Sequence, residues 1–161
     1  MSDRTVNILF CGTGGQGVLK AAEICGVAAM FAGLHAKKSE VHGMAQRGGS
    51  VESHVRFGKQ VFSPIIPKGS VDILVPFYAE EEARLRDFLK PDGKDLMPVL
   101  VKFRQAGTSV RYLNTYLLGA LAAHLDLPQP AWTKALEQEF KTKNLEENQR
   151  IFLEGWKEVK P

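Results

Sequence analysis

Apolar and polar positions follow one another along this chain in a pattern typical of alternating strands and helices. Residues 6–11 form a short apolar run that ends in glycines, which predicts a buried parallel strand. Residues 18–32 predict a helix that Gly33 ends, and this helix is apolar nearly all round. A helix on one face of a sheet needs only one apolar stripe. We therefore expect a second side of this helix to be buried as well, either by another subunit or by the chain's own C-terminal helices.

The next segments predict a strand and a β-hairpin. Residues 34–39 are a candidate strand that Lys37 and Lys38 weaken. Residues 50–57 alternate between two faces of a strand. One face holds Val51, Ser53, Val55 and Phe57, and the other holds Ser50, Glu52, His54 and Arg56. A turn at 58–60 would let residues 61–66 return as the second arm of the hairpin, which Pro64 and Pro67 restrict to an edge or an irregular strand.

The second half of the chain is mainly helical. We expect a strand at 71–76, a helix at 80–89, a turn at 91–93 and a further strand at 97–103. Asn114 should cap a helix that runs to about 125, Pro130 should open the next helix, and a last helix should span about 145–159. This order predicts a single α/β domain over residues 1–161, with a mainly parallel sheet, a β-hairpin insertion and a helical C-terminal tail.

Composition excludes several classes of protein. The net charge of +3 is small and no basic run concentrates it, which argues against nucleic-acid binding. There is no signal-peptide pattern and no stretch of transmembrane length, so we expect a cytoplasmic protein without membrane contact. Cys11 and Cys25 stand in apolar segments, outside any C-x-x-C motif, and are expected to be buried free thiols. Two cysteines cannot hold a four-cysteine iron–sulfur cluster, and we expect no metal site.

The first candidate site is a glycine loop between the first strand and the first helix. The loop is Gly12-Thr13-Gly14-Gly15-Gln16-Gly17, with the spacing G-x-G-x-x-G. Its candidate binding or interface residues are Gly12, Gly14, Gly15, Gln16 and Gly17. Such a loop lets the backbone approach a ligand closely, and the helix that follows offers free N–H groups to an anion. A tight strand-to-helix crossing would explain the glycines equally well. NAD sites have an acidic residue at the end of the second strand that binds the ribose, but here the first acid, Glu40, follows two lysines. The lysines would suit a ligand with an additional phosphate, such as NADP or coenzyme A. The alternative is that the two lysines are simply solvated.

The second candidate site is residues 39–50, SEVHGMAQRGGS. Its candidate ligand-binding or interface residues are Ser39, Gln46, Arg47, Gly48, Gly49 and Ser50. His42 and Glu40 could form an acid–base pair, but no nucleophile stands visibly beside them, and a loop whose polar groups bind one another is the simpler interpretation. Arg47 could bind a carboxylate or phosphate with two hydrogen bonds, or contact a subunit. Both candidate sites should lie at the carboxyl end of the sheet, where ligands bind in open α/β folds.

These motifs resemble those of a known family. The glycine loop, the segment 39–51 and His54-Val55-Arg56 resemble the gamma-type (pyruvate/ketoisovalerate oxidoreductase) domain of 2-oxoacid:ferredoxin oxidoreductases, and within that family the beta subunits of indolepyruvate ferredoxin oxidoreductases. The pattern continues through 63–67, Asp72, 82–84, 114–120, 146–148 and 152–155, so it covers most of the chain. The stretch 90–113 departs from it, because it is shorter than the family's usual segment.

The resemblance implies a Rossmann-like subunit of a heteromeric oxidoreductase that is inactive alone. A larger partner would carry thiamine diphosphate, magnesium and iron–sulfur clusters, decarboxylate a 2-oxoacid, reduce ferredoxin and use coenzyme A as co-substrate to form an acyl-CoA. This chain would bind none of these cofactors by itself, and it could assemble as a dimer of heterodimers. The alternative is a stand-alone sensor that binds a nucleotide or coenzyme A at the glycine loop. We expect Arg47→Ala to weaken assembly or turnover while the isolated chain stays folded, and unchanged specific activity of the reconstituted complex would contradict this.

Overall fold

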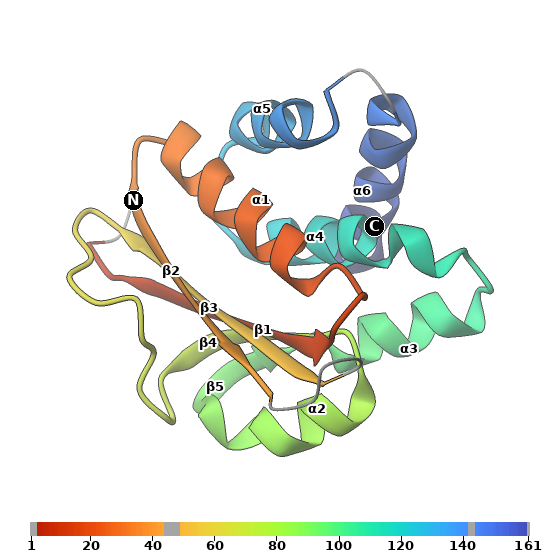
Figure 1. Ribbon diagram of the computed structural model, residues 1–161. Helices are drawn as coiled ribbons and strands as arrows, with labels where there is room; N and C mark the ends of the chain where they lie inside the picture. Colours follow the sequence, from red (N-terminus) through yellow and green to blue (C-terminus); the bar gives the residue numbers. More distant parts are fainter. Residues whose placement is uncertain (1–2, 44–48, 142–143, 161) are drawn as a thin grey trace.

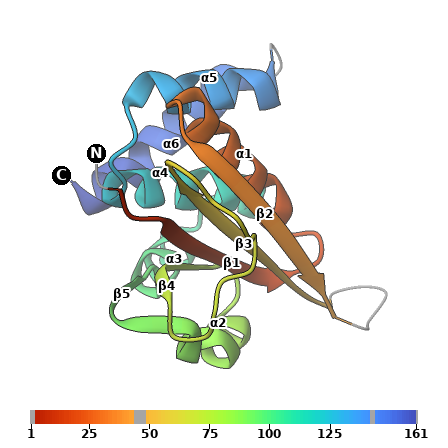
Figure 2. The same cartoon turned by 90° about the vertical axis from the view of Figure 1, so that its left-hand side faces the viewer.

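The protein is an α/β fold in which one five-stranded sheet separates two unequal layers of helices. The structure is a computed structural model and describes residues 3–43, 49–141 and 144–160. Figures 1 and 2 show α1, α4, α5 and α6 on one face of the sheet and α2 on the other. The elements in chain order are β1 (Val6–Thr13), α1 (Val18–Phe31), β2 (His35–His42), β3 (Ser50–Gly58), β4 (Val71–Pro76), α2 (Ala79–Leu85), η1 (Arg86–Phe88), β5 (Leu89–Asp95), α3 (Met97–Gln105), η2 (Val110–Tyr112), α4 (Leu113–His124), α5 (Gln129–Phe140) and α6 (Leu145–Val159).

The sheet is mixed, which corrects the prediction of a mainly parallel sheet. Its strand order is β2-β3-β1-β4-β5. β1 pairs with β4 and β4 with β5 in parallel, whereas β3 is antiparallel to both β1 and β2. The physical reason is the length of the connection: only seven residues join β2 to β3, whereas a parallel neighbour needs a crossover of about a dozen residues or more.

The predicted alternation of β3 is confirmed. Val51, Val55 and Phe57 belong to the main core beneath α1, while Glu52 contacts Arg84 of α2 on the other face. The predicted second arm of a hairpin at 61–66 is wrong, because the structure has no strand there. Two histidines hold this segment instead, since Val61 N–H donates to His35 Nδ1 and Ile66 N–H donates to His54 Nδ1. The hairpin partner of β3 is β2, which extends past the predicted 34–39 to His42.

Two further predictions fail in the segment 89–105. Residues 91–93, predicted as a turn, lie within the bounds of the edge strand β5, but its pairing with β4 is irregular there, because Val71 pairs with Leu89 and Ile73 with Lys94; a proline is tolerated at such a bulge on an edge strand. Residues 97–103, predicted as a strand, form the helix α3, with Pro98 in its first turn. Val99, Leu100 and Phe103 of α3 are buried in the main core. The apolar run therefore marks one face of a helix.

The helices of the second half are otherwise close to expectation. Pro130 lies in the first turn of α5, and α6 spans the predicted residues. α2 ends at Leu85, and a short 3-10 turn replaces the rest of the predicted helix 80–89. Asn114 is not the cap of α4: the helix begins at Leu113, and the Asn114 side chain accepts a hydrogen bond from Thr115 N–H at 2.8 Å.

The second buried side of α1 is provided by the chain itself. α5 packs against α1, where Lys20 pairs with Glu139 at 3.5 Å and lies over the Phe140 ring. Of the two alternatives for the second buried side of α1, the structure shows burial by the chain's own C-terminal helices. Met30 and Phe31 at its end stay exposed.

Candidate functional site

The loop between β1 and α1 depends on two glycines that have different physical roles. Gly12 is buried, and a Cβ there would lie 2.8 Å from both Phe77 Cβ and Val18 Cγ2, so no side chain fits. Gly17 is the N-cap of α1 and has φ of 88°, in the left-handed region that favours glycine. α1 consequently begins without a side-chain cap. Its first N–H groups can donate to an anion or to another protein's carbonyl or carboxylate.

Gln16 fixes the shape of this loop. Its Oε1 accepts a hydrogen bond from Thr13 N–H at 2.8 Å, and its Nε2 donates to the carbonyl oxygen of Phe77 at 3.3 Å. The same carbonyl accepts a hydrogen bond from Nη2 of Arg104 at 3.0 Å. Arg104, an exposed residue of α3, therefore brings its guanidinium to the glycine loop. Sequence reasoning missed this residue because it expected a strand at 97–103.

The loop and the second glycine-rich segment meet at the carboxyl end of β1. Gly14 N–H donates to the carbonyl of Gly49 at 3.1 Å, and Thr13 pairs with Ser50 across the sheet. Gly14 and Gly15 are exposed, so the loop presents its backbone to the outside. The structure thus places Gly49 and Ser50 beside the glycine loop. Gln46, Arg47 and Gly48 lie outside the described residues.

Asn114 packs directly beneath the start of α1. A Cβ on Gly17 would lie 2.9 Å from Asn114 Nδ2, and the Asn114 side chain is buried. Its Oδ1 accepts from Thr115, which in turn donates from Oγ1 to Asn148 Oδ1 at 2.7 Å. These contacts tie the glycine loop to α4 and α6. They explain why two polar side chains, Asn114 and Thr115, lie buried in the first turn of α4.

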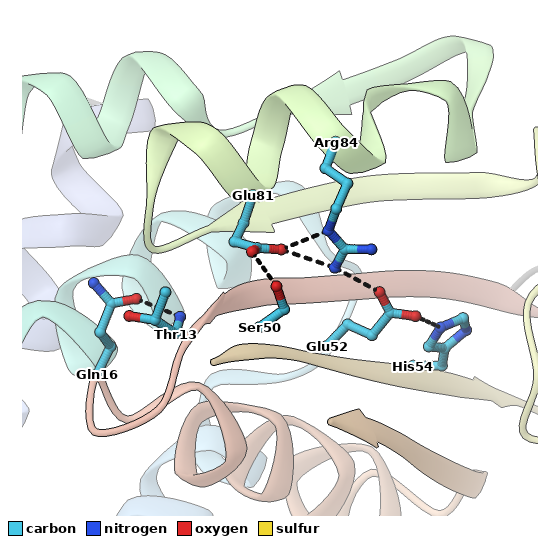
Figure 3. A network of polar contacts seen from close by, with 7 residues as sticks. All are labelled: Thr13, Gln16, Ser50, Glu52, His54, Glu81 and Arg84. Atoms are coloured by element: carbon cyan, nitrogen blue, oxygen red, sulfur yellow. Dashed lines mark hydrogen bonds and ion pairs between the residues drawn. The ribbon is translucent and has the colours of Figure 1, made fainter. Parts of the chain in front are cut away.

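A buried polar network runs from this loop along the face of the sheet that α2 covers (Figure 3). Ser50 Oγ donates to Glu81 at 2.5 Å, and Arg84 donates to Glu81 from Nε at 2.8 Å and to Glu52 from Nη2 at 3.0 Å. Glu52 and Glu81 are 8% and 7% exposed, so these carboxylates depend on Arg84 for charge balance. Two carboxylates against one guanidinium leave this side of the site with an excess of negative charge.

His54 closes the network on the far side of Glu52. Ile66 N–H donates to His54 Nδ1 at 3.2 Å, which assigns the proton of the neutral ring to Nε2. Nε2 then donates to Glu52 Oε1 at 3.3 Å. This bond, followed by the guanidinium of Arg84, lowers the pKa of Glu52 below its ordinary value, although burial opposes the shift. Glu52 is therefore held ionised.

The two residues considered as an acid–base pair lie elsewhere. Glu40 and His42 belong to the edge strand β2 and point to the α1 face, opposite the network, since they pair across the strands with Ser53 and Val51. Their side chains are separated by 3.7 Å between His42 Nε2 and Glu40 Oε2, and Glu40 also pairs with Lys38 at 3.1 Å. Ser39, which precedes Glu40 in sequence, lies on the α2 face opposite His54. Ser53 lies across from Glu40, but no hydrogen bond joins a hydroxyl or thiol to Glu40 or His42 among the described residues, so a catalytic role for this pair remains a prediction.

A second carboxyl pair lies close to the site. Glu82, almost fully buried, accepts two hydrogen bonds from Arg86 and shares another with Asp95 at the carboxyl end of β5. Burial, followed by the neighbouring Glu82, raises the pKa of Asp95 to about 6. A group whose pKa is raised on folding stabilises the fold while it is protonated, and this contribution is lost as the pH rises through about 6.

This pair gives a testable prediction. Asp95→Asn keeps an acceptor for Met97 N–H and removes the charge, so it should raise stability at pH 8 by about 1 kcal/mol, or about 2–4 °C in Tm. The gain should shrink at pH 4.5, where the wild-type carboxyl is protonated. Thermal unfolding at both pH values measures it, with Asp92→Asn on the same strand as a control, because the Asp92 side chain is 84% exposed. A variant less stable than wild type at pH 8 would contradict the prediction.

The cysteines are buried, and the described side chains form no cluster of metal ligands. Cys11 and Cys25 are free and buried, as expected, and burial raises the pKa of both thiols. Within residues 3–43, 49–141 and 144–160, no group of three or more histidine, cysteine, aspartate or glutamate side chains could hold a metal ion. No helix in the same residues is both long and apolar enough to cross a membrane.

Comparison with known proteins decides the family. The model of the family described as pyruvate ferredoxin/flavodoxin oxidoreductase matches residues 7–158. The chain belongs to this family. The matched residues include both candidate segments and the helices that pack behind them. They also include the short stretch 90–113, which contains most of β5 together with α3 and the turn η2.

Two curated relatives are similar over part of the chain. The indolepyruvate oxidoreductase subunit IorB of Thermococcus kodakarensis is 45% identical over 87 residues, which is 54% of this chain and 43% of that protein. The subunit of the same name from Archaeoglobus fulgidus is 49% identical over 84 residues, or 52% of this chain and 41% of that protein. The chain thus matches less than half the length of these relatives.

Two solved structures share the fold. The 2-oxoglutarate:ferredoxin oxidoreductase from Magnetococcus marinus, solved with 2-oxoglutarate, coenzyme A and succinyl-CoA bound, matches with a TM-score of 0.81 at 20% identity, over 99% of this chain and 32% of that chain. The gamma subunit of a keto/oxoacid ferredoxin oxidoreductase from Geobacter sulfurreducens matches with a TM-score of 0.77 at 23% identity, over 96% of this chain and 98% of that one. At these identities the likeness shows the common fold.

Proposed function

We propose that this chain is a single gamma-type domain that acts as the small subunit of a 2-oxoacid:ferredoxin oxidoreductase, similar to the IorB subunits. A larger subunit would carry out the thiamine-dependent oxidative decarboxylation of a 2-oxoacid to an acyl-CoA, and electrons would pass to ferredoxin. An aromatic 2-oxoacid is favoured through the similarity to indolepyruvate oxidoreductase subunits. The observation that carries the proposal is the family match over residues 7–158.

The geometry supports a role at an interface. The glycine loop presents exposed backbone at Gly14 and Gly15 and an uncapped helix start, next to the guanidinium of Arg104. The buried network of Ser50, Glu52, Glu81 and Arg84 satisfies its own hydrogen bonds. Such a surface positions donors for a partner or for a ligand that the partner holds. We propose that the glycine loop, together with residues 46–50, forms this contact.

The residues that the structure describes do not fit a metal cofactor. The chain's two thiols are buried, with raised pKa values, and they belong to two different elements, β1 and α1. The iron–sulfur clusters, magnesium and thiamine diphosphate that the proposed reaction needs are therefore assigned to the larger subunit. Coenzyme A is the co-substrate that the glycine loop could touch, since free N–H groups and Arg104 suit its phosphates.

Arg104→Ala tests this assignment. The side chain is exposed, so its loss should leave the fold intact but weaken binding to the larger subunit, or raise the KM for coenzyme A, by about tenfold, the size of one charged hydrogen bond. The assay is reconstitution of the complex from separately purified subunits under anaerobic conditions, with titration of coenzyme A. Arg47→Ala is tested in the same assay.

Lys134→Ala is the matched control. Lys134 lies over the Phe31 ring at the opposite end of α1, about 20 Å along the helix from the glycine loop. Its substitution should change neither assembly nor the KM for coenzyme A. If Arg104→Ala behaved like Lys134→Ala, the proposed contact at the glycine loop would be wrong. Tight binding of NADP or coenzyme A by the isolated chain would instead favour the stand-alone sensor.

A further inference from the structure

A cavity of about 390 Å³ opens at the end of the sheet opposite the glycine loop. It lies where β1, β4 and β5 begin, where β3 ends and where α4 ends, and none of the residues discussed as the candidate site lines it. β1 separates the two places: seven residue steps from Val6 to Thr13 span about 23 Å at about 3.3 Å each. The volume is at the small end of the range for ligand pockets.

The cavity has an apolar interior. Phe57 and Ile73, from the central part of the sheet, are almost fully buried and line it, and the partly buried side chains of Val6, Leu34 and Leu125 complete the apolar lining. A ligand that fills this space therefore gains most by burying an apolar body. Phe57 supplies an aromatic ring to pack against it.

Most of the charged groups at the cavity neutralise one another. Asp72 accepts ion pairs from Arg4 at 3.0 Å and from Lys90 at 2.6 Å, and Asn7 N–H donates to its second oxygen at 2.8 Å. Lys90 also approaches Asp92 at 3.7 Å. These groups form a closed set at one wall and offer little net charge to a ligand.

Two nitrogen-bearing side chains at the cavity remain without a partner. Within the part of the chain that the structure describes, the side chains of Lys94 and His124 make no ion pair and no hydrogen bond, and both line the cavity. Burial and then the positive charges of Lys94 and Lys160 lower the pKa of His124, and no carboxylate acts in the opposite direction. Asp126, also at the cavity, is exposed. Lys94 thus supplies a positive charge that no carboxylate among the described residues pairs with, and His124 supplies an N–H donor beside it.

We propose that this cavity is a binding site for a small organic acid with an apolar, ring-sized body. The carboxylate is held by Lys94 and by an N–H of His124, and the apolar body lies against Phe57 and Ile73. A carboxylate pairs with the Lys94 ammonium and accepts the His124 N–H, both of which lack a partner in the described part of the chain, and the apolar walls select against inorganic anions, which cannot use them. The site is independent of the function proposed above.

Phenylacetate is a suitable probe for this site, and its neutral amide is the matched control. Titration of the full chain with phenylacetate, followed by two-dimensional ¹H–¹⁵N NMR, should shift the backbone amides of Gly58 and Leu125 at the cavity and leave those of Gly14 and Gly15 unchanged. Phenylacetamide has the same shape without the charge and should bind about tenfold more weakly, and so should inorganic phosphate. Equal binding of acid and amide, or shifts only at the glycine loop, would overturn the proposal.

Variants separate the contributions of Lys94 and His124 from the general charge of the protein. Lys94→Gln removes the positive charge and His124→Phe removes the N–H donor, and each should weaken phenylacetate binding about tenfold. Lys134→Gln, at an exposed lysine of α5, removes the same charge elsewhere and should leave the affinity unchanged. Backbone amide signals away from the cavity that match those of the wild type would show that the variants fold. Unchanged affinity of both cavity variants would overturn the proposal, as would an absence of any shift with tens of millimolar phenylacetate.

Discussion

Replacing Gly119 with alanine is expected to lower the free energy of unfolding by about 3 kcal/mol, which corresponds to a fall in Tm of about 6–12 °C. Gly119 lies on α4 where it crosses α6, and a Cβ there would lie far inside van der Waals contact of the Phe152 carbonyl oxygen. Gly155 on α6 meets the Tyr116 carbonyl of α4 in the same way. Because both neighbours are backbone atoms, no rotamer change relieves the clash, and the helices must separate.

Gly26→Ala is the matched control for this prediction. Gly26 is also a helical glycine, in α1, but a Cβ there meets no atom within 4 Å. This substitution should stabilise the protein by about 0.5–1 kcal/mol, because alanine loses less backbone entropy than glycine on folding. Urea unfolding of the two variants beside wild type gives both values. Gly119→Ala within about 0.5 kcal/mol of wild type would mean that α4 and α6 do not pack as closely as the structure has them.

Removing the guanidinium of Arg84 should have the next largest effect. Arg84→Met leaves Glu52 and Glu81 as two buried carboxylates without a cation, and this should destabilise the protein by about 2 kcal/mol at pH 7.5. The value for a fully buried pair would be higher, but half of the Arg84 side chain is exposed and water screens the charges.

The pH dependence of this effect has a definite sign. The folded state lowers the pKa of Glu52, so its carboxylate stabilises the fold above its ordinary pKa of 4.5, and this contribution is lost as the pH falls below that value. The difference between wild type and Arg84→Met should therefore be largest at neutral pH and shrink towards pH 3.5. Urea unfolding across this range measures it, and a difference that grew on acidification would show that the network is held together in some other way.

Arg150→Met is the control for Arg84→Met. Arg150 also pairs with two carboxylates, those of Glu147 and Glu154, but both of these are well exposed on α6. Water replaces the lost partner there, so little change in stability is expected at any pH. The contrast between the two arginines isolates the burial of the carboxylates as the cause of the effect.

The part of the site that sequence could predict is the part set by local patterns. An apolar run, a glycine loop and an apolar helix place Gly12 and Gly17 without any tertiary information. The alternation of residues 50–57 also places Glu52 and His54 on one face, which the structure confirms for the α2 side. Local periodicity could not predict which element of the fold packs against that face. A buried carboxylate needs a partner, and the Glu81 and Arg84 pair at helical spacing was the one signal in the sequence that pointed to α2.

Other features depended on contacts between distant residues. The segment 97–103 has an apolar run that suits either a short strand or one face of a helix, and packing of Phe103 against Tyr116 of α4 decides for the helix. For this reason Arg104 could not be placed at the glycine loop. The antiparallel direction of β3 was also hidden, because it depends on the connection of residues 43–49 rather than on the composition of either strand.

The resemblance of segments 114–120 and 152–155 to the oxidoreductase family has a structural explanation. The two segments contain Gly119 and Gly155, which allow the backbones of α4 and α6 to touch. The first also contains Asn114, which lies beneath the start of α1. The close packing of α4 and α6 therefore positions Asn114, the residue against which the glycine loop packs.

An affinity pull-down of the tagged chain from its native cells, under anaerobic conditions, tests the central claim most directly. We predict that the chain brings down a larger subunit, identified by mass spectrometry, and that the purified complex contains iron and oxidises a 2-oxoacid only when thiamine diphosphate and coenzyme A are present. A chain recovered alone, without iron and without a stable partner, would contradict the claim that it is a subunit of a 2-oxoacid:ferredoxin oxidoreductase.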